Sequence, residues 1–262
     1  MEEKIAHLEK ILRANAPLIV AYSGGVDSAC LLAMASRTLG DQALGVIADS
    51  PSLPRKALED ALVTAKAFGA RVETIQTLEM ENPEYTENPM NRCYFCKSEL
   101  FLRLDRLAEE RGFAAIAYGE NADDPAHLRP GSKAAAEFKI LGPLKAAGLT
   151  KADVRELSRK LGLPTADAPA QPCLSSRIPH GTPVTREALE LVERGEDFIR
   201  SMGFRIFRVR YIAGESPSAR VQISPAEMAG IPNLQPEIER GLIAVGFTGV
   251  EIDPEGYRSA GG

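Results

Sequence analysis

Hydrophobic and polar positions along the first half of the chain follow two periods. Apolar residues at helical spacing within 2–15 precede an apolar run at 17–22 that is typical of a buried strand. The pattern further predicts strands at 43–48, 71–75 and 114–118 and helices at 25–39, 54–69 and 96–111. Strands and helices that alternate through short connections predict an α/β fold with a doubly wound, mostly parallel sheet. Ligands of such sheets bind beyond the carboxyl ends of the strands.

A proline-rich stretch at 162–183 separates this half from the rest. Beyond it the pattern predicts a small α+β arrangement, with helices at 186–202 and 235–245 and strands at 205–211, 219–223 and 248–252. We therefore expect two domains, 1–177 and 178–262. By the family resemblance set out below, the second is expected to bind substrate and to form oligomer contacts.

The loop after the first strand carries the clearest chemical signal. Two glycines let its backbone approach an anion, and the helix that follows directs unpaired N–H groups at the same point. The sequence of this loop lacks the lysine of a Walker loop and the glycine spacing of a dinucleotide-binding fingerprint. A bound pyrophosphate would therefore need Mg²⁺, for which Asp27 is the nearby carboxylate. The predicted binding residues are Ser23, Gly24, Gly25, Val26, Asp27 and Ser28.

Three of the four cysteines are candidates for chemistry. Cys93 and Cys96 form a C-x-x-C pair at the start of a predicted helix, where the helix dipole lowers thiol pKa. With Cys173 they could hold a 4Fe-4S cluster whose open iron carries a sulfide. Zinc with His180 as a fourth ligand, or simple thiol chemistry, remains an alternative. Cys30, on an apolar helix, is expected to be a core thiol.

Composition narrows the class of protein. The chain has 262 residues, a formal net charge of -5 and 44% hydrophobic residues, which is typical of a globular protein. Its apolar runs are too short to cross a membrane, and its charged N-terminus is unlike a signal peptide, so we expect a cytoplasmic location. The acidic balance argues against nucleic acid as a partner. Every cation after Ile178 is an arginine, which suits anion recognition, although an ordinary solvated surface explains it equally well.

The loop resembles the signature of the PP-loop ATP pyrophosphatase superfamily over roughly residues 15–165. That resemblance implies AMP transfer to a substrate oxygen with release of pyrophosphate. It places adenosine near 48–50 and 118–124, makes Asp123 a second candidate Mg²⁺ ligand, and puts Lys139 near the pyrophosphate. Lys97 and Lys145 are weaker candidates to offset the charge of ATP.

The full pattern resembles the LarE family of sulfur transferases. It combines the loop with Asn91–Lys97, Pro172–Gly181 and Phe207–Arg210. The resemblance implies adenylylation of both carboxylates of pyridinium-3,5-biscarboxylic acid mononucleotide and their conversion to thiocarboxylates for the nickel-pincer nucleotide cofactor of lactate racemase. One branch sacrifices the sulfur of the cysteine that matches Cys173. The branch with three cysteines is associated with a 4Fe-4S cluster, and this sequence has all three.

Several further roles follow from the same resemblance. Arg208 and Arg210 alternate on one face of a predicted strand, which suits a phosphate clamp. The resemblance adds Arg258 to this anion site and places Glu196 in the active site with the cysteines and Asp27. Gln222 stands where the sacrificial branch has a carboxylate. A symmetric homo-oligomer, with a hexamer as one candidate form, is also implied.

Other functions remain open at this point. A tRNA thiolation enzyme can combine the same loop with three cysteines, but the acidic balance argues against an RNA surface. A nucleotide or cluster sensor without turnover is a second alternative. The sequence leaves undetermined the sulfur source, the assembly of the cluster and the nickel enzyme that receives the product.

Overall fold

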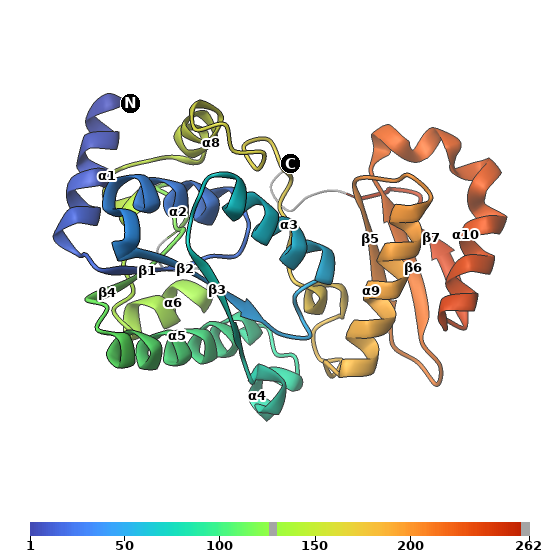
Figure 1. Cartoon of the computed structure of the whole chain (residues 1–262). Coiled ribbons are helices and arrows are strands. Elements are labelled where there is room, and N and C mark those ends of the chain that lie inside the picture. Colours follow the sequence, from blue (N-terminus) through green and yellow to red (C-terminus); the bar gives the residue numbers. More distant parts are fainter. Residues whose placement is uncertain (126–129, 258–262) are drawn as a thin grey trace. The chain divides into compact units, whose positions relative to one another are not determined.

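The computed structural model describes residues 1–125 and 130–257. They form two compact units, each described here by itself (Figure 1). The first contains residues 1–79 and 91–171, and the second contains residues 80–90 and the chain from Pro172 onward. This division differs from the expected boundary after residue 177 because the segment around Ser175 bonds to the second unit. The hydroxyls of Tyr85 and Ser175 lie 2.6 Å apart, and Asn88 donates to the Pro179 carbonyl at 2.8 Å.

The first unit is built on a four-stranded parallel sheet. Its order is β3-β2-β1-β4, so the chain crosses over the sheet in both directions, as predicted for a doubly wound fold. The strands are β1 (Leu18–Ala21), β2 (Ala43–Asp49), β3 (Val72–Gln76) and β4 (Ala115–Tyr118). All four residues of β1 are buried, which explains why it reads as a continuous apolar run.

Helices cover both faces of this sheet. Successive β1 residues enter opposite cores: Leu18 and Val20 pack with the helices after the glycine loop, whereas Ile19 and Ala21 pack against Phe101. Helices α1, α2, α3 and α8 contribute to the first core and α5 and α6 to the second (Figure 1). The bounds are α1 (Glu2–Ala14), α2 (Val26–Leu39), α3 (Arg55–Ala67), α5 (Arg92–Arg111), α6 (Pro130–Glu137), α7 (Pro143–Ala146) and α8 (Lys151–Lys160).

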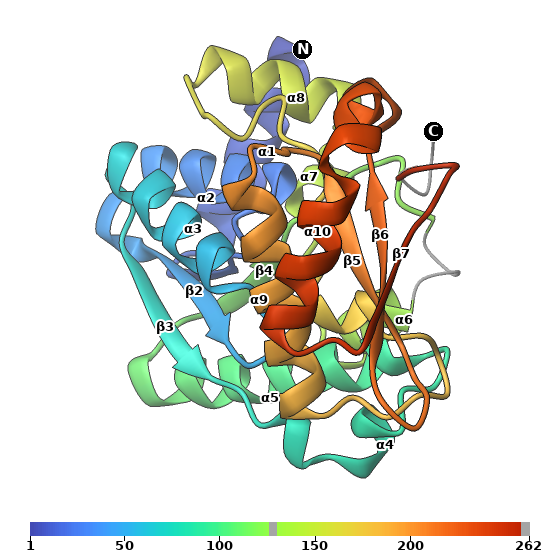
Figure 2. The same ribbon diagram turned by 90° about the vertical axis from the view of Figure 1, so that its right-hand side faces the viewer.

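The second unit packs two helices on one face of a small sheet (Figure 2). Strands β5 and β6 are antiparallel, and β7 lies parallel to β6. Alternate side chains such as Val209 and Val221 are fully buried against α9 and α10. The bounds are α4 (Pro83–Thr86), α9 (Arg186–Ser201), β5 (Phe207–Ile212), β6 (Ser218–Ile223), α10 (Ile231–Val245) and β7 (Gly249–Ile252). The α/β sheet and the smaller C-terminal α+β unit confirm the predicted fold class.

Short 3-10 turns complete the described chain. They are η1 (Gly40–Gln42), η2 (Glu79–Glu81), η3 (Leu174–Arg177) and η4 (Pro225–Gly230). None of the helices in the described ranges is long and apolar enough to span a membrane.

Candidate functional site

The glycine loop joins β1 to α2 at the carboxyl end of the sheet. Gly24 has φ +76°, and a Cβ there would lie 2.7 Å from the Cβ of Ala61, so only glycine fits the turn. Helix α2 begins at Val26, directly after Gly25. The Ser28 hydroxyl accepts from the Ser23 N–H at 3.2 Å and lies 3.1 Å from the Ser23 hydroxyl. The two serines therefore hold the loop closed and leave the backbone N–H groups at the helix start to meet an anion.

The segment after β4 packs directly on this loop. A Cβ at Gly119 would lie 2.6 Å from the backbone nitrogen of Ser28, so glycine is required for the approach. Two residues later the Asn121 side chain donates to Asp27 Oδ1 at 3.3 Å. The carboxyl ends of β1 and β4 thus contribute to one site, as expected for a sheet of this topology.

Lys151 supplies the cation that the loop itself lacks. Its Nζ lies 2.5 Å from Asp27 Oδ2, and its backbone N–H donates to Asp123 Oδ2 at 2.8 Å. Lys151 is the first residue of α8, whose start is fixed by a capping box between Thr150 and Asp153. The sequence analysis predicted neither this lysine nor this helix. The Thr-x-x-Asp sequence of the capping box is the local signal that could have marked the helix start.

The predicted roles of Lys97, Lys139 and Lys145 near ATP stay predictions. Lys145 Nζ pairs with Glu120 at 3.1 Å and donates to the Asp124 carbonyl. Lys97 lies over the ring of Phe101. Lys139 is exposed, with φ +54°, and no polar contact in the described chain joins its side chain to the loop.

The two predicted Mg²⁺ ligands lie on either side of Lys151. Asp27 and Asp123 contact its side chain and its backbone respectively. Among the residues that the structure describes, no group of three or more His, Cys, Asp or Glu side chains is arranged to hold a metal. Mg²⁺ fits this donor set because it is commonly bound by one or two carboxylates together with phosphate oxygens and water.

The cysteines have three different environments. Cys93 and Cys96 lie in the first two turns of α5, three residues apart and hence on one side of the helix. Cys93 is exposed and Cys96 is half-buried. Cys173 is half-buried and directly precedes η3 in the second unit. Cys30 is fully buried, and burial raises its pKa to about 12, which confirms it as a core thiol.

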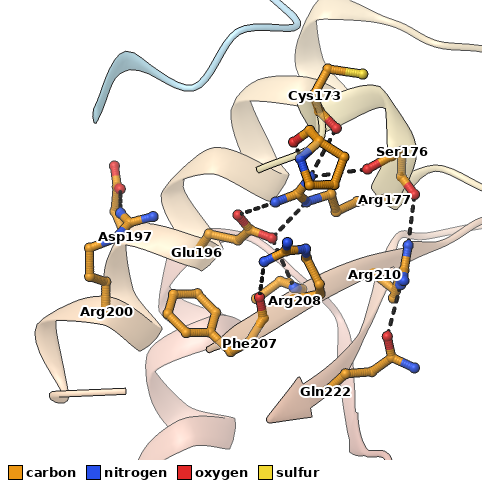
Figure 3. Close-up of polar contacts among 12 residues, drawn as sticks. Cys173, Ser176, Arg177, Glu196, Asp197, Arg200, Phe207, Arg208, Arg210 and Gln222 are labelled. Atoms are coloured by element: carbon orange, nitrogen blue, oxygen red, sulfur yellow. Dashed lines mark hydrogen bonds and ion pairs between the residues drawn. The ribbon is translucent and has the colours of Figure 1, made fainter. Parts of the chain in front are cut away.

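Arg177 holds the Cys173 segment to α9 through a buried ion pair (Figure 3). Its Nε and Nη2 donate to the two carboxylate oxygens of Glu196 at 2.8 and 3.0 Å, and both side chains are at most 5% exposed. Its Nη1 donates to the Cys173 carbonyl at 2.9 Å. Glu196 Oε1 also accepts from the Val209 N–H at 3.2 Å, so both carboxylate oxygens are occupied. Glu196 is therefore placed as a support for the Cys173 segment and for β5.

Arg208 and Arg210 lie on the polar face of β5, with buried Val209 between them, so the predicted alternation is confirmed. The Arg208 guanidinium lies 4.6 Å from the ring centre of Tyr257, in cation–π contact. Burial and the positive charge of Arg177 lower the pKa of both arginines. We call Arg177, Arg208 and Arg210 the arginine cluster. In Figure 3 Arg177 and Arg210 both donate to Ser176, to its hydroxyl and its carbonyl respectively, whereas Arg208 donates to the Phe207 carbonyl.

Some site residues were missed or fall outside the described ranges. Arg258, the third predicted anion ligand, lies outside the described residues. Tyr257, Asn121 and Lys151 were not predicted as site residues. Arg177 lies within a motif that the sequence analysis used, but its pairing with Glu196 depends on the fold.

The parallel sheet with a glycine loop before α2 defines an α/β protein of the PP-loop class. No protein-family model matches the chain. The pyridinium-3,5-bisthiocarboxylic acid mononucleotide synthase of Lactiplantibacillus plantarum is 32% identical over 257 residues, covering 98% of this chain and 92% of that protein. The chain belongs to the family of that synthase, the LarE family of sulfur-transferase enzymes.

Two further relatives span nearly the whole chain. An uncharacterized protein of Synechocystis sp. is 41% identical, covering 99% of this chain and 96% of its own length. An uncharacterized protein of Methanocaldococcus jannaschii is 29% identical, covering 94% and 92% respectively. Both units of the structure are therefore shared with these relatives.

Proposed function

We propose that this chain is an ATP-dependent sulfur transferase that converts the carboxylates of pyridinium-3,5-biscarboxylic acid mononucleotide to thiocarboxylates. The observation that carries the proposal is the 32% identity to a bisthiocarboxylic acid mononucleotide synthase over 98% of the chain. The glycine loop and the arginine cluster support it, because the reaction needs one site for ATP and one for a phosphorylated substrate. Its product would serve nickel-pincer nucleotide biosynthesis and so the maturation of a lactate racemase.

The ATP half of the reaction is assigned to the first unit. The backbone of residues 23–28 would bind the pyrophosphate, and Asp27 would hold Mg²⁺, which neutralises charge on the phosphates when bound. The Lys151 ammonium group adds a positive charge, and this group can exchange its contact with the Asp27 carboxylate for one with the phosphates. AMP transfer makes a poor leaving group, the carboxylate oxygen, into a good one.

The substrate phosphate is assigned to Arg208 and Arg210, with Arg258 as a third ligand by resemblance. Guanidinium groups present several N–H donors in a plane and bind phosphate by paired hydrogen bonds. Burial, followed by the positive charge of Arg177, lowers the pKa of both groups, and a bound phosphate dianion would offset that positive charge. Tyr257 stacks on Arg208 and so limits its orientations.

The sulfur half is assigned to Cys93, Cys96 and Cys173, which we propose as ligands of a 4Fe-4S cluster. When bound, such a cluster supplies sulfide at its open iron. Attack by sulfur on the acyl adenylate forms a carbon–sulfur bond as the carbon–oxygen bond to AMP breaks. The hydrogen bond from Arg177 to the Cys173 carbonyl fixes the backbone at this cysteine. Cys173 is required whether the sulfur comes from a cluster or from the cysteine itself. By resemblance we also propose a cytoplasmic homo-oligomer, with a hexamer as one candidate form.

Release of AMP and pyrophosphate that depends on the mononucleotide tests the ATP half. The intact chain is expected to form both products only when the mononucleotide is present, and Asp27→Asn is expected to abolish their formation. Iron and acid-labile sulfide on anaerobically purified protein test the sulfur half. About four of each per chain, lost in Cys93→Ala, would support the cluster. Conversion of Cys173 to dehydroalanine would instead identify a sacrificial sulfur donor.

A further inference from the structure

Arg210 is held by neutral groups rather than by a carboxylate. Its Nε donates to Gln222 Oε1 at 2.9 Å, and its Nη1 donates to the Ser176 carbonyl at 2.7 Å. In the described part of the chain no carboxylate forms an ion pair with Arg210. Because neutral acceptors do not offset the positive charge of a guanidinium, that charge stays available to attract an anionic ligand.

Gln222 links this arginine to a carboxylate farther along the sheet. Its Nε2 donates to Asp253 Oδ2 at 2.8 Å. Its Oε1 accepts from Arg210, as Figure 3 shows. Gln222 also pairs directly with Arg208 across β5 and β6. An amide can accept on one side and donate on the other, whereas an ionised carboxylate only accepts. A glutamate at this position would form an ion pair with Arg210 and would face the carboxylate of Asp253.

Asp253 also organises the turn that carries Tyr257. Its Oδ1 accepts from the Glu255 N–H and its carbonyl accepts from the Gly256 N–H, both at 3.0 Å. Gly256 has φ +69°, and a Cβ there would lie 2.4 Å from a backbone carbonyl oxygen of β6, so glycine is required. This turn positions the Tyr257 ring beneath Arg208. Asp253 thus positions both Gln222, which contacts Arg210, and the turn that carries Tyr257, which contacts Arg208.

We propose that Gln222 is a positioning and specificity residue that adapts the site to a phosphate monoester dianion. Gln222 aligns Arg210 through a neutral acceptor and keeps the negative charge of Asp253 one side chain away from Arg210. The proposal rests on the assignment of the substrate phosphate to Arg208 and Arg210. The site retains charge that a carboxylate would neutralise.

Calorimetric titration of the full chain with nicotinic acid mononucleotide and with inorganic phosphate tests this role. Binding that survives when both Arg208 and Arg210 are changed to Gln belongs to other anion sites, including the glycine loop, and is subtracted. Gln222→Glu is expected to weaken the remaining binding about tenfold or more, because a directly paired carboxylate competes with the ligand. Gln222→Met, neutral and similar in size, is expected to weaken it only about threefold. Gln235→Glu, an exposed change on α10, controls for added charge.

The pH dependence separates positioning from simple structural damage. In the unmodified chain, affinity for the mononucleotide is expected to rise as its phosphate loses the second proton near pH 6. Gln222→Glu should flatten this rise and Gln222→Met should preserve it. Equal weakening and identical pH profiles in the two variants would overturn the proposal, as would unchanged affinity in Gln222→Glu.

The test is independent of sulfur transfer. If the intact chain binds neither probe, the phosphate assignment and the role of Gln222 both fail. If it binds them with the expected pattern but forms no thiocarboxylate, the role of Gln222 stands and the proposed reaction fails.

Discussion

Removal of the Glu196 carboxylate is expected to destabilise the second unit strongly. In Glu196→Ala the Arg177 guanidinium, whose side chain is 3% exposed, would remain buried without its counter-charge. The Val209 N–H would also lose the carboxylate that accepts its hydrogen bond. Breaking a buried ion pair by removing one partner typically costs about 3–5 kcal/mol.

The remaining contacts of Arg177 place the expected loss near the lower end of that range. Its Nη1 keeps the carbonyls of Pro172 and Cys173 as neutral acceptors, at 2.5 and 2.9 Å. These acceptors compensate part of the lost pairing, so we expect a decrease in the free energy of unfolding of about 3 kcal/mol. Glu196→Gln retains one acceptor oxygen and should lose less. The Cys173 segment should loosen with α9 in both variants.

Urea denaturation followed by far-ultraviolet circular dichroism measures this effect, since the chain has no tryptophan for fluorescence. Asp167→Ala is the matched control because the Arg159–Asp167 pair is 53% and 73% exposed, and such surface pairs contribute about 0–1 kcal/mol. In Glu196→Ala we also expect weaker phosphate binding with unchanged ATP binding. A loss of stability no larger than that of Asp167→Ala would refute the reasoning.

Three further predictions follow from individual groups. Lys151→Met should weaken ATP binding measured by calorimetry and reduce pyrophosphate release at least tenfold, since the loop would lose its cation; unchanged binding would contradict this role. Burial raises the pKa of Cys30 to about 12 from 9.0, which lowers the fraction of its thiolate form about a thousandfold. After treatment with iodoacetamide at about pH 8, mass spectrometry should therefore find Cys93, which is exposed, modified and Cys30 intact. Early labelling of Cys30 would disprove this environment. The hydrogen bond from Lys4, followed by that from the Thr150 N–H, lowers the pKa of Asp153 to about 2 from 3.8. The resulting stabilisation is present above about pH 4 and is lost as the pH falls to about 2. Urea denaturation should therefore show that the difference in the free energy of unfolding between the intact chain and Asp153→Asn shrinks over that interval. A constant difference would exclude this cause.

The first unit was largely predictable because its central strands, β1 and most of β2, are buried on both faces. A strand such as β1, with every residue buried, reads as an apolar run bounded by turn residues. The helices α6 to α8 were not predicted, because α6 and α7 are short and α8 is strongly polar on its exposed side. The start of α5 at Arg92 also preceded the predicted start at Cys96, so both cysteines lie within the helix.

The candidate site was predictable where its residues are local in sequence. The glycine loop and the alternation of Arg208 and Arg210 depend only on short-range geometry. Lys151 and Asp27 are 124 positions apart, and Arg177 meets Glu196 only because η3 packs on α9. Such pairings depend on tertiary contacts, for which neither spacing nor composition carries a signal. The fold brings Lys151 to the loop, a contact that the sequence analysis did not predict.

The most direct test of the central proposal is the chemical identity of the product. The full chain, reconstituted with iron and sulfide without oxygen, would be incubated with Mg²⁺, ATP and pyridinium-3,5-biscarboxylic acid mononucleotide, and the mononucleotide analysed by mass spectrometry. We predict replacement of carboxylate oxygen by sulfur, with one AMP and one pyrophosphate released for each sulfur added. Recovery of unchanged mononucleotide from protein that still binds ATP and phosphate would contradict the proposed function.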